Sequence, residues 1–318
     1  MNLATRRRKA VVKISFSTSW VDGDTVRLLS ILPHVDYIEV GSKGDSGFFE
    51  QVEELAMSGE LKVGSIHATA GPHKKQKETS YTPHLASDDP ALQKRDIEDI
   101  FLTAEWAMKL GASNIVLHIG KIEDPKLREL FLLYKSLAVE QGGTDGLGDL
   151  RNDIVKRRAG HKDHLDRVVP VLERLCRKYP KINFCFETRL HYYEIPTPDE
   201  ADCIFKRVLL PNLGYWHDIG HTWTLNRLGF VPMQEWQARF GDRCRGVHVH
   251  DSGEDLTDHY PPGFGSMDLR GILRQFENVT VYTLETNYRH TKEEVLAGIS
   301  YLRNLFVSSG QKNQSMSG

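Results

Sequence analysis

The stretch LGYWHDIGH, residues 213–221, begins as an apolar run and ends in the polar residues His217, Asp218 and His221. Burying a histidine or an aspartate is costly unless the side chain is paired or bound to something. The run itself has the length and residue types of a buried strand. We therefore expect a strand over 213–220 that carries polar groups to its carboxyl end.

The same pattern recurs along the chain. Eight short apolar and β-branched runs are predicted to be strands: residues 11–17, 36–41, 62–68, 114–120, 183–188, 213–220, 244–251 and 279–286. Amphipathic helical patterns separate them, such as residues 88–111, which start near Pro90 and stop at Gly111. This alternation predicts an α/β fold with a parallel sheet closed into a (β/α)8 TIM barrel. An open doubly wound sheet is the alternative, although no Gly-rich phosphate turn follows the first strand.

We expect one domain, the barrel at 11–307, with a helical insertion after strand four. The insertion falls in the longest connection, residues 121–181, as two helices joined by GGTDGLGD at 142–149. Residues 1–10 form a basic N-terminal segment, and residues 308–318, SSGQKNQSMSG, are predicted to be a disordered tail.

The composition is that of an average soluble globular protein, with 318 residues, 40% hydrophobic and 26% charged. The formal net charge of −2 gives no overall attraction to nucleic acid or to an anionic membrane. No segment approaches the roughly 18 apolar residues of a membrane helix, and the N-terminus lacks a signal-peptide pattern. The four cysteines form no C-x-x-C pair, which fits free thiols in a reducing compartment and a cytoplasmic location.

Polar residues end six consecutive predicted strands. They are His67, His118, Glu187, Asp218 with His221, His248 with His250 and Asp251, and Glu285. In a barrel these strand ends converge on one mouth, where active sites lie. A single histidine or glutamate there is more often structural, but packing explains six in succession poorly. Imidazole and carboxylate groups without thiolate predict binding of a divalent metal such as Zn²⁺, Mn²⁺, Fe²⁺ or Co²⁺.

Several short motifs then allow a family comparison. They are SIHA (65–68), HLASDDPALQKRDIEDIFLTAEWAMKLGASNIVLHIG (84–120), FET (186–188), HDIGH (217–221), VHVHD (247–251), DHYPPGFGSMDL (258–269) and LET (284–286). Their order and spacing, over about residues 11–306, resemble the xylose-isomerase-like TIM-barrel superfamily. That superfamily includes sugar (phosphate) isomerases and epimerases and endonuclease IV, so the motifs are specific to the superfamily and not to one reaction.

The resemblance implies roles for individual residues. Its isomerase and epimerase members imply one metal on Glu187, Asp218, His248 and Glu285. Its endonuclease members imply His67 and His118 for a second metal and His221 and His259 for a third, or these residues bind substrate. The endonuclease pattern has an aspartate two residues before the loop histidine, where this chain has Thr257, with Asp258 shifted by one. We therefore expect one or two metals in preference to three.

Two carboxylates on either side of a metal-bound substrate suit removal and return of a proton next to a carbonyl. We therefore predict a metal-dependent isomerase or epimerase that acts on a sugar or sugar phosphate through an enediolate, with Glu187 and Glu285 as catalytic residues. One alternative is an endonuclease IV-like hydrolase that cleaves abasic DNA. Another is a metal-binding barrel without catalysis.

Substrate contacts are predicted from the loops of the mouth. Arg189, His191, Trp216, His250 and Arg289 are the candidates for binding a small sugar. Lys74, Lys75 and Lys77 could hold a phosphate group or form a solvated loop. We expect neither a membrane nor nucleic acid as a partner, and a homo-oligomer remains an open alternative.

Overall fold

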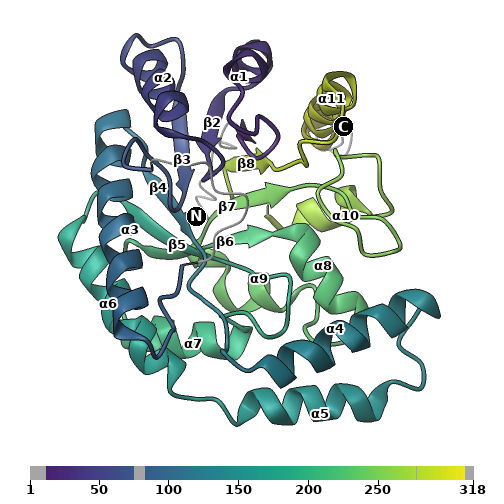
Figure 1. The fold of residues 1–318 in the computed structure, drawn as a ribbon. Coiled ribbons are helices and arrows are strands. Elements are labelled where there is room, and N and C mark those ends of the chain that lie inside the picture. Colours follow the sequence, from purple (N-terminus) through teal and green to yellow (C-terminus); the bar gives the residue numbers. More distant parts are fainter. Residues whose placement is uncertain (1–11, 75–82, 277, 312–318) are drawn as a thin grey trace, which may run out of the picture.

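The computed structural model describes residues 12–74, 83–276 and 278–311. Eight parallel strands pair with their neighbours in sequence, and the last pairs with the first to close the barrel seen in Figure 1. The strands are β1 Lys13–Ser17, β2 Tyr37–Val40, β3 Val63–His67, β4 Asn114–Leu117, β5 Asn183–Glu187, β6 Leu213–Asp218, β7 Cys244–Val249 and β8 Val281–Leu284. The predicted (β/α)8 TIM barrel is confirmed.

Helices form the layer around the barrel (Figure 1). They are α1 Thr25–Ile31, α2 Ser46–Met57, α3 Pro90–Leu110, α4 Pro125–Glu140, α5 Gly148–Ala159, α6 His164–Lys178, α7 Pro198–Arg207, α8 Ile219–Arg227, α9 Glu235–Phe240, α10 Leu269–Leu273 and α11 Lys292–Gln311. The described residues also form three short 3₁₀ helices, Leu32–His34, Gly241–Arg243 and Arg274–Phe276. Within the described ranges, no helix is both long enough and apolar enough to cross a membrane.

Helix α3 shows how local sequence sets an element's ends. The carboxylate of Asp89 accepts hydrogen bonds from the backbone N–H groups of Ala91 and Leu92, and Pro90 occupies the first turn, where no N–H is needed. Gly111 ends the helix with φ of 71°, a conformation that favours glycine. The helix predicted at 88–111 therefore spans Pro90–Leu110.

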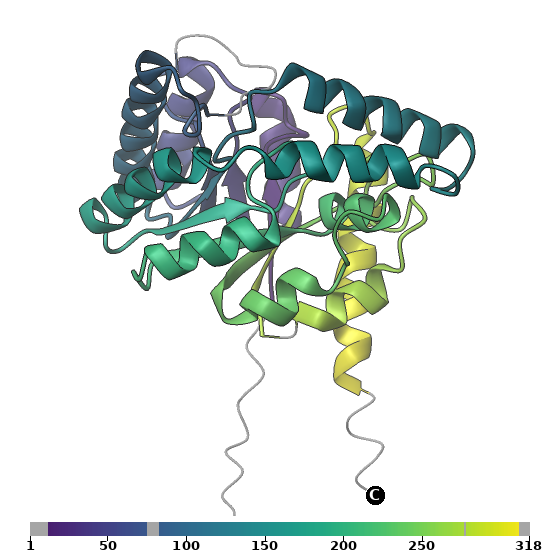
Figure 2. The ribbon, with the colours of Figure 1, turned by 90° about the horizontal axis from the view of Figure 1, so that it is seen from below.

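Three helices, α4, α5 and α6, lie between β4 and β5, and α4 and α5 run side by side in both ribbon views (Figures 1 and 2). An ion pair joins the start of α4 to the end of α5, with Nε of Arg157 2.6 Å from Oδ2 of Asp124. Helix α11 continues to Gln311, so residues 308–311 of the expected tail are helical. Residues 1–10 and 312–318 lie outside the described residues.

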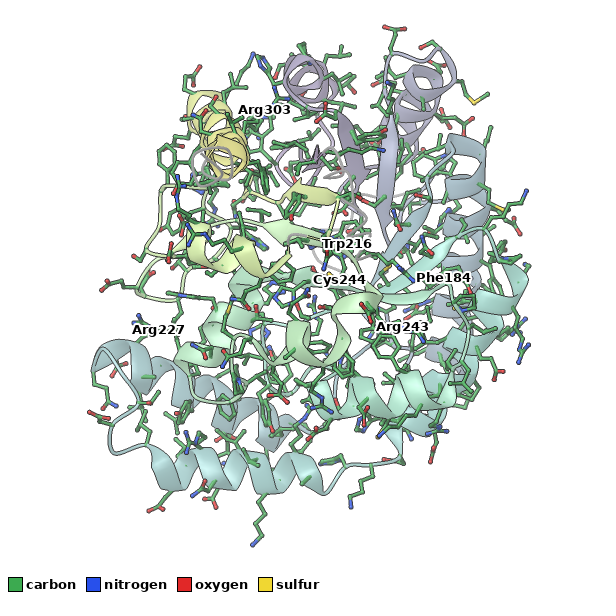
Figure 3. All side chains as sticks on the ribbon, turned by 180° about the vertical axis from the view of Figure 1, so that it is seen from behind. Phe184, Trp216, Arg227, Arg243, Cys244 and Arg303 are labelled. Carbon is green, nitrogen blue, oxygen red and sulfur yellow. The ribbon has the colours of Figure 1, made fainter. Side chains whose placement is uncertain are left out.

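The barrel interior is filled below the mouth by Trp216, Val116 and Cys185, which pack against one another and are fully buried. Trp216 has this space because Gly246 on the next strand has no side chain: a Cβ there would lie 2.2 Å from the indole ring. Figure 3 shows Trp216 near the centre of the molecule. The ring centroid of Trp216 lies 5.6 Å from that of His248, so the indole forms the floor on which the mouth residues rest.

Candidate metal centre

The site begins where β6 passes directly into α8 at Asp218. Asp218 is the N-cap of α8, and its Oδ1 accepts the backbone N–H of His221 at 2.8 Å. This bond uses one carboxylate oxygen for capping and leaves the other for the mouth. Gly220 is needed in the first turn, since a Cβ there would lie 2.0 Å from the ring of His250. The HDIGH segment thus ends a strand, starts a helix and leaves room for a neighbouring imidazole.

The four predicted principal ligands come together at the mouth, and we call them the central group: Glu187, Asp218, His248 and Glu285. All four are buried, and one candidate ligand atom from each lies within 4.8 Å of the others. Nδ1 of His248 is 2.6 Å from Oε1 of Glu187, 3.2 Å from Oε2 of Glu285 and 3.7 Å from Oδ2 of Asp218. Three carboxylates therefore converge on one imidazole nitrogen.

Glu187 is held as a carboxylate by its neighbours. Burial alone would raise the pKa of Glu187, but the charges of Arg189 and His118 outweigh it and hold that pKa well below its usual range. The guanidinium of Arg189 hydrogen-bonds to Oε2 of Glu187, and Nε2 of His118 lies 2.8 Å from the same oxygen. Glu187 is therefore ionised and fixed in position.

Glu285 and His248 have pKa values shifted upward. Burial, together with the charges of Glu187 and Glu39, raises the pKa of Glu285 to about 7, although His248 opposes the rise. Burial would lower the pKa of His248, but the surrounding carboxylates, Glu39 first among them, raise it well above its usual range. The central group thus has more negative charge than its own imidazole can compensate.

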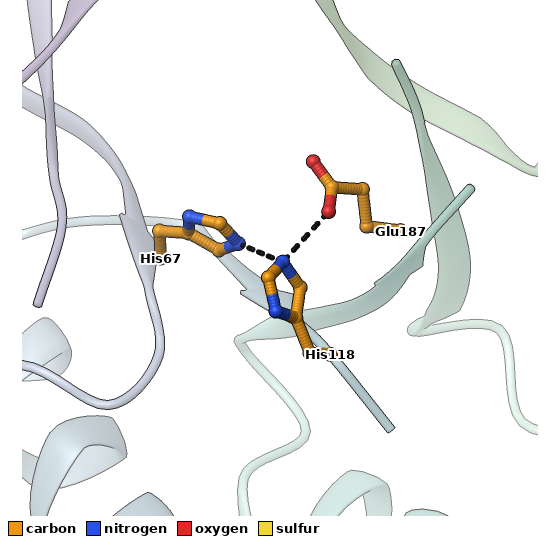
Figure 4. A group of neighbouring side chains, drawn as sticks. All are labelled: His67, His118 and Glu187. Carbon is orange, nitrogen blue, oxygen red and sulfur yellow. Dashed lines mark hydrogen bonds and ion pairs between the residues drawn. The ribbon is translucent and has the colours of Figure 1, made fainter. Parts of the chain in front are cut away.

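A second group lies beside the first and shares Glu187 with it (Figure 4). It consists of His67, His118 and Glu187. Nε2 of His67 lies 3.0 Å from Nε2 of His118, and both histidines point toward the same space. Burial, followed by the charge of His118, lowers the pKa of His67 well below its usual range. A neutral imidazole keeps a lone pair for a metal, so this group also has ligand chemistry.

The opposite side of the mouth holds two overlapping groups. They are Asp218, His221 and His250, and His221, Asp258 and His259. Asp258 and His259 come from the loop after β7, where His259 has φ of 62°. The aspartate that stands one position later than in the endonuclease pattern therefore still lies beside His221 and His259. Thr257, which takes the pattern's position, instead hydrogen-bonds to Asp255.

The residues present fit a divalent ion. Oδ2 of Asp218 is buried and has no hydrogen-bond partner among the described residues, which is costly unless a cation compensates it. Nδ1–H of His221 donates to the carbonyl of Thr188 at 2.9 Å. Nε2 of His221 therefore carries no proton and has a lone pair with which to bind a metal. Nitrogen and oxygen donors of this kind suit Zn²⁺, Mn²⁺, Fe²⁺ or Co²⁺.

Among the predicted substrate-binding residues, three lie at the site. Arg189 is buried between Glu187 and Glu194, with its guanidinium 2.9 Å from Oε1 of Glu194. Nδ1 of His191 lies 3.0 Å from Oε2 of Glu194. Nε2 of His250 lies 3.0 Å from Oδ1 of Asp218; burial would lower the pKa of His250, but Asp218 raises it to about 9. Arg189 and His250 are thus already paired with central-group carboxylates.

Two other predicted substrate contacts lie elsewhere. Trp216 is on the barrel floor, beneath His248, and is fully buried. Arg289 is exposed, with its guanidinium 5.8 Å from the ring centroid of Tyr288. Neither residue lies where it could contact a substrate bound at the central group.

The lysine segment predicted as a phosphate contact is described only in part. Nζ of Lys74 lies 3.0 Å from Oδ2 of Asp99, so this lysine has a carboxylate partner on α3. Lys75 and Lys77 lie outside the described residues.

Two polar residues of the strand ends have structural roles. His217 points away from the mouth: its Nε2 lies 3.0 Å from Oγ1 of Thr222, and its ring packs on Phe276. The carboxylate of Asp251 accepts backbone N–H groups from the following loop, namely those of Ser252, Gly263 and Met267. Asp251 therefore shapes the loop that carries His259.

Sequence analysis missed Glu39 of β2. Glu39 is fully buried, and its Oε1 lies 2.8 Å from Nε2 of His248. The signal was present, because a glutamate inside the apolar run YIEV of residues 37–40 is unusual for a buried strand. Glu39 lies inside the predicted strand at 36–41 and not at its end, so the pattern of strand-end residues does not include it.

Comparisons with known proteins agree with this architecture. Over residues 49–305 the sequence matches the family described as xylose isomerase-like TIM barrel. A D-tagatose 3-epimerase-like protein is similar in structure, with a TM-score of 0.65, 20% identity, and coverage of 94% of this chain and 99% of its own. An L-ribulose 3-epimerase has a TM-score of 0.64 at 14% identity and covers 97% and 99%.

A D-allulose 3-epimerase from Methylomonas sp. has a TM-score of 0.61 at 16% identity and covers 93% and 98%. Identities this low show a common fold. No curated protein matches the chain. The family match spans well over half of the 318 residues and confirms the resemblance inferred from the motifs, so this chain belongs to the xylose isomerase-like TIM barrel family.

Proposed function

We propose that the protein is a divalent-metal-dependent isomerase or epimerase that acts on a sugar or sugar phosphate by proton transfer through an enediolate. The observation that carries this proposal is the arrangement of Glu187 and Glu285. They come from strands three apart in the barrel, and both reach Nδ1 of His248, at 2.6 and 3.2 Å. A substrate bound over the central group would therefore lie between two carboxylates.

The two carboxylates suit different parts of a proton transfer. Glu187 is held ionised by Arg189 and His118, whereas burial and neighbouring carboxylates raise the pKa of Glu285 to about 7. Unlike environments are typical of an acid and base pair. When bound, a divalent cation would polarise the carbonyl and hydroxyl oxygens of the substrate. Glu285 would then transfer the proton on one face of the substrate, and Glu187 would transfer it on the opposite face.

The structural neighbours support a sugar substrate. The solved proteins described above are named as a D-tagatose 3-epimerase-like protein, a D-allulose 3-epimerase and an L-ribulose 3-epimerase, and each is matched over nearly its whole length. Arg189 is bonded to two glutamates through its terminal nitrogens, and its buried Nε–H, which has no hydrogen-bond partner among the described residues, would be the donor to a substrate hydroxyl group. The net charge of −2 gives no general attraction for a nucleic acid. We propose a small sugar as substrate and a cytoplasmic location.

The test is metal analysis of the purified protein, followed by NMR detection of deuterium from solvent in a panel of ketoses and ketose phosphates. Metal bound at the centre and deuterium at a carbon next to a carbonyl would support the enediolate reaction. A metal-loaded protein that exchanges no proton in any member of the panel would contradict it.

A second function is favoured by the ligand groups on both sides of the centre. Glu187 is shared with His67 and His118, and Asp218 is shared with His221 and His250. Divalent ions held in such a row of groups would activate water for hydrolysis of a phosphodiester, as in the endonuclease IV alternative. Cleavage of an oligonucleotide duplex with one abasic site, with no deuterium exchange in sugars, would favour this function.

The number of ions separates these two functions further. An isomerase of the proposed kind needs only the metal ion of the central group. Asp258→Asn should therefore keep that ion and leave proton exchange in the sugar unchanged. In the hydrolase the same change should remove one ion and lower DNA cleavage. Bound metal with neither activity would point to the third possibility, a metal-binding barrel without catalysis.

A further inference from the structure

We infer that Glu39 is a positioning residue of the metal centre: it fixes the ring of His248 so that Nδ1 faces the central group. This inference rests on the proposed metal site, although not on any particular reaction. It goes beyond the four ligands, because Glu39 lies on a different strand and does not belong to any of the ligand groups.

The first argument is the geometry of the imidazole. The two ring nitrogens of His248 face opposite partners: Nδ1 faces the three carboxylates of the central group, and Nε2 lies 2.8 Å from Oε1 of Glu39. Ligation through Nδ1 requires the remaining ring proton to lie on Nε2. The carboxylate of Glu39 is the acceptor for that proton and so selects the tautomer that can bind a metal.

The second argument is that Glu39 is itself held in place. The hydroxyl of Ser65 on β3 donates to Oε2 of Glu39 at 2.7 Å, so each carboxylate oxygen has its own partner. Both Ser65 and Glu39 are fully buried. Burying a carboxylate costs free energy unless it is paired. Among the described residues, the imidazole that bonds to Glu39 is that of His248, a proposed ligand. A chain of three side chains thus runs from β3 through β2 to the ligand on β7.

The third argument is steric. The His248 ring packs on the Trp216 floor at a centroid distance of 5.6 Å and against His67 at the same distance. These contacts hold the ring plane, but a turn about the Cβ–Cγ bond would still exchange the nitrogen and carbon edges. The hydrogen bond from Nε2 to Glu39 resists that turn, because the flipped ring would present a C–H to the carboxylate.

The experiment uses the full chain, stripped of metal and titrated with Co²⁺, whose visible absorption reports both affinity and coordination. Two variants grade the effect. Glu39→Gln keeps an oxygen that can accept from Nε2–H but removes the charge, and Glu39→Met keeps the volume but removes the acceptor. Losing an outer partner of a metal-bound histidine typically weakens metal binding about 10–100-fold. We expect Glu39→Gln to weaken Co²⁺ binding by a factor near the lower end of this range and Glu39→Met by a factor near its upper end. Glu39→Met should also change the Co²⁺ spectrum.

The matched control is Glu200→Gln, which alters another glutamate bonded to a histidine, with Oε1 of Glu200 2.8 Å from Nε2 of His164. This pair lies outside the ligand groups, so Co²⁺ affinity and spectrum should stay as in the unmodified protein. If the Glu39 variants do not fold, Ser65→Ala takes their place, since it frees Oε2 of Glu39 and should weaken Co²⁺ binding by a smaller factor.

Unchanged Co²⁺ affinity and spectrum in both Glu39 variants, or in Ser65→Ala as their replacement, would overturn the inference and leave Glu39 a core residue. Asp218→Asn distinguishes this failure from failure of the metal site. If Asp218→Asn also binds Co²⁺ as the unmodified protein does, the site itself is misassigned. If only Asp218→Asn loses Co²⁺, the site is correct and the role of Glu39 is not.

Discussion

Two of the regions that hold carboxylates differ in their electrostatics. Where α5, α6 and α7 meet, Glu200 is bonded to Arg158 and His164; burial opposes ionisation, but these partners lower the pKa of Glu200 to about 2. In the central group, burial and like charges raise the pKa of Glu285 to about 7. Ionised Glu200 therefore stabilises the helix junction, whereas ionised Glu285 destabilises the folded mouth. A cation bound at the mouth would compensate this destabilisation.

The largest effect should come from Asp218, one of the residues that two ligand groups share. Asp218→Asn removes the carboxylate whose Oδ2 has no partner among the described residues. We expect the affinity for a divalent ion to fall by more than the roughly 100-fold that marks the loss of an outer partner. Equilibrium dialysis with Mn²⁺ or Zn²⁺ measures this, and His248→Ala should behave likewise. Unchanged metal content in both variants would refute the central group as a metal site.

The next effect is on the reaction. Glu285→Gln keeps the shape of the side chain but removes the site that exchanges a proton, so with excess metal the rate should fall by about 10²–10⁴-fold. Deuterium incorporation into the substrate sugar measures it, in samples shown to be metal-loaded. Near-normal exchange would mean that Glu285 acts as a ligand alone, and the hydrolytic function would then be the better proposal.

Both predictions concern residues that sequence analysis identified, and the reason is geometric. In a parallel barrel, all strand ends reach one mouth, so residue types at those ends predict a site before any coordinates exist. Glu187, Asp218, His248 and Glu285 were found in this way. Whether they bind metal and transfer protons stays a prediction.

What sequence missed depends on side-chain direction and on loop conformation. Side chains alternate along a strand, so His217 points outward once its neighbour Asp218 points inward. The same alternation takes Trp216 into the barrel, beneath the site. Asp258 could not be placed from spacing alone, because the backbone of His259, with φ of 62°, decides where the loop brings both side chains.

A smaller effect concerns the stability of the mouth without metal. The folded-state pKa of Glu285 is about 7 against an ordinary 4.5, so the folded chain binds more protons between these values and stability falls as the pH rises through them. Glu285→Gln should remove this fall and stabilise the metal-free protein at pH 8 by at most about 3 kcal/mol. Urea unfolding in EDTA measures it. A variant less stable than the parent at pH 8 would contradict the view that like charges oppose folding here.

At the helix junction, replacing the glutamate by glutamine should change stability in the opposite direction. The folded-state pKa of Glu200 is about 2, below the ordinary 4.5, so its contribution to stability is complete above about pH 4.5 and is lost as the pH falls toward 2. Glu200→Gln should therefore destabilise the protein at pH 7, by about 2 kcal/mol once solvent screening is allowed for. The difference between variant and parent should shrink as the pH is lowered from 4.5 to 3.

Urea unfolding at pH 7, 4.5 and 3 in EDTA measures both variants under the same conditions. The comparison between the two regions requires that Glu200→Gln lose stability where Glu285→Gln gains it, because Arg158 is left without its anion in one case and a crowded carboxylate is removed in the other. If both substitutions changed stability in the same direction at pH 7, charge would not be what distinguishes the junction from the mouth. Side-chain packing, and not electrostatics, would then have to explain why these carboxylates are gathered together.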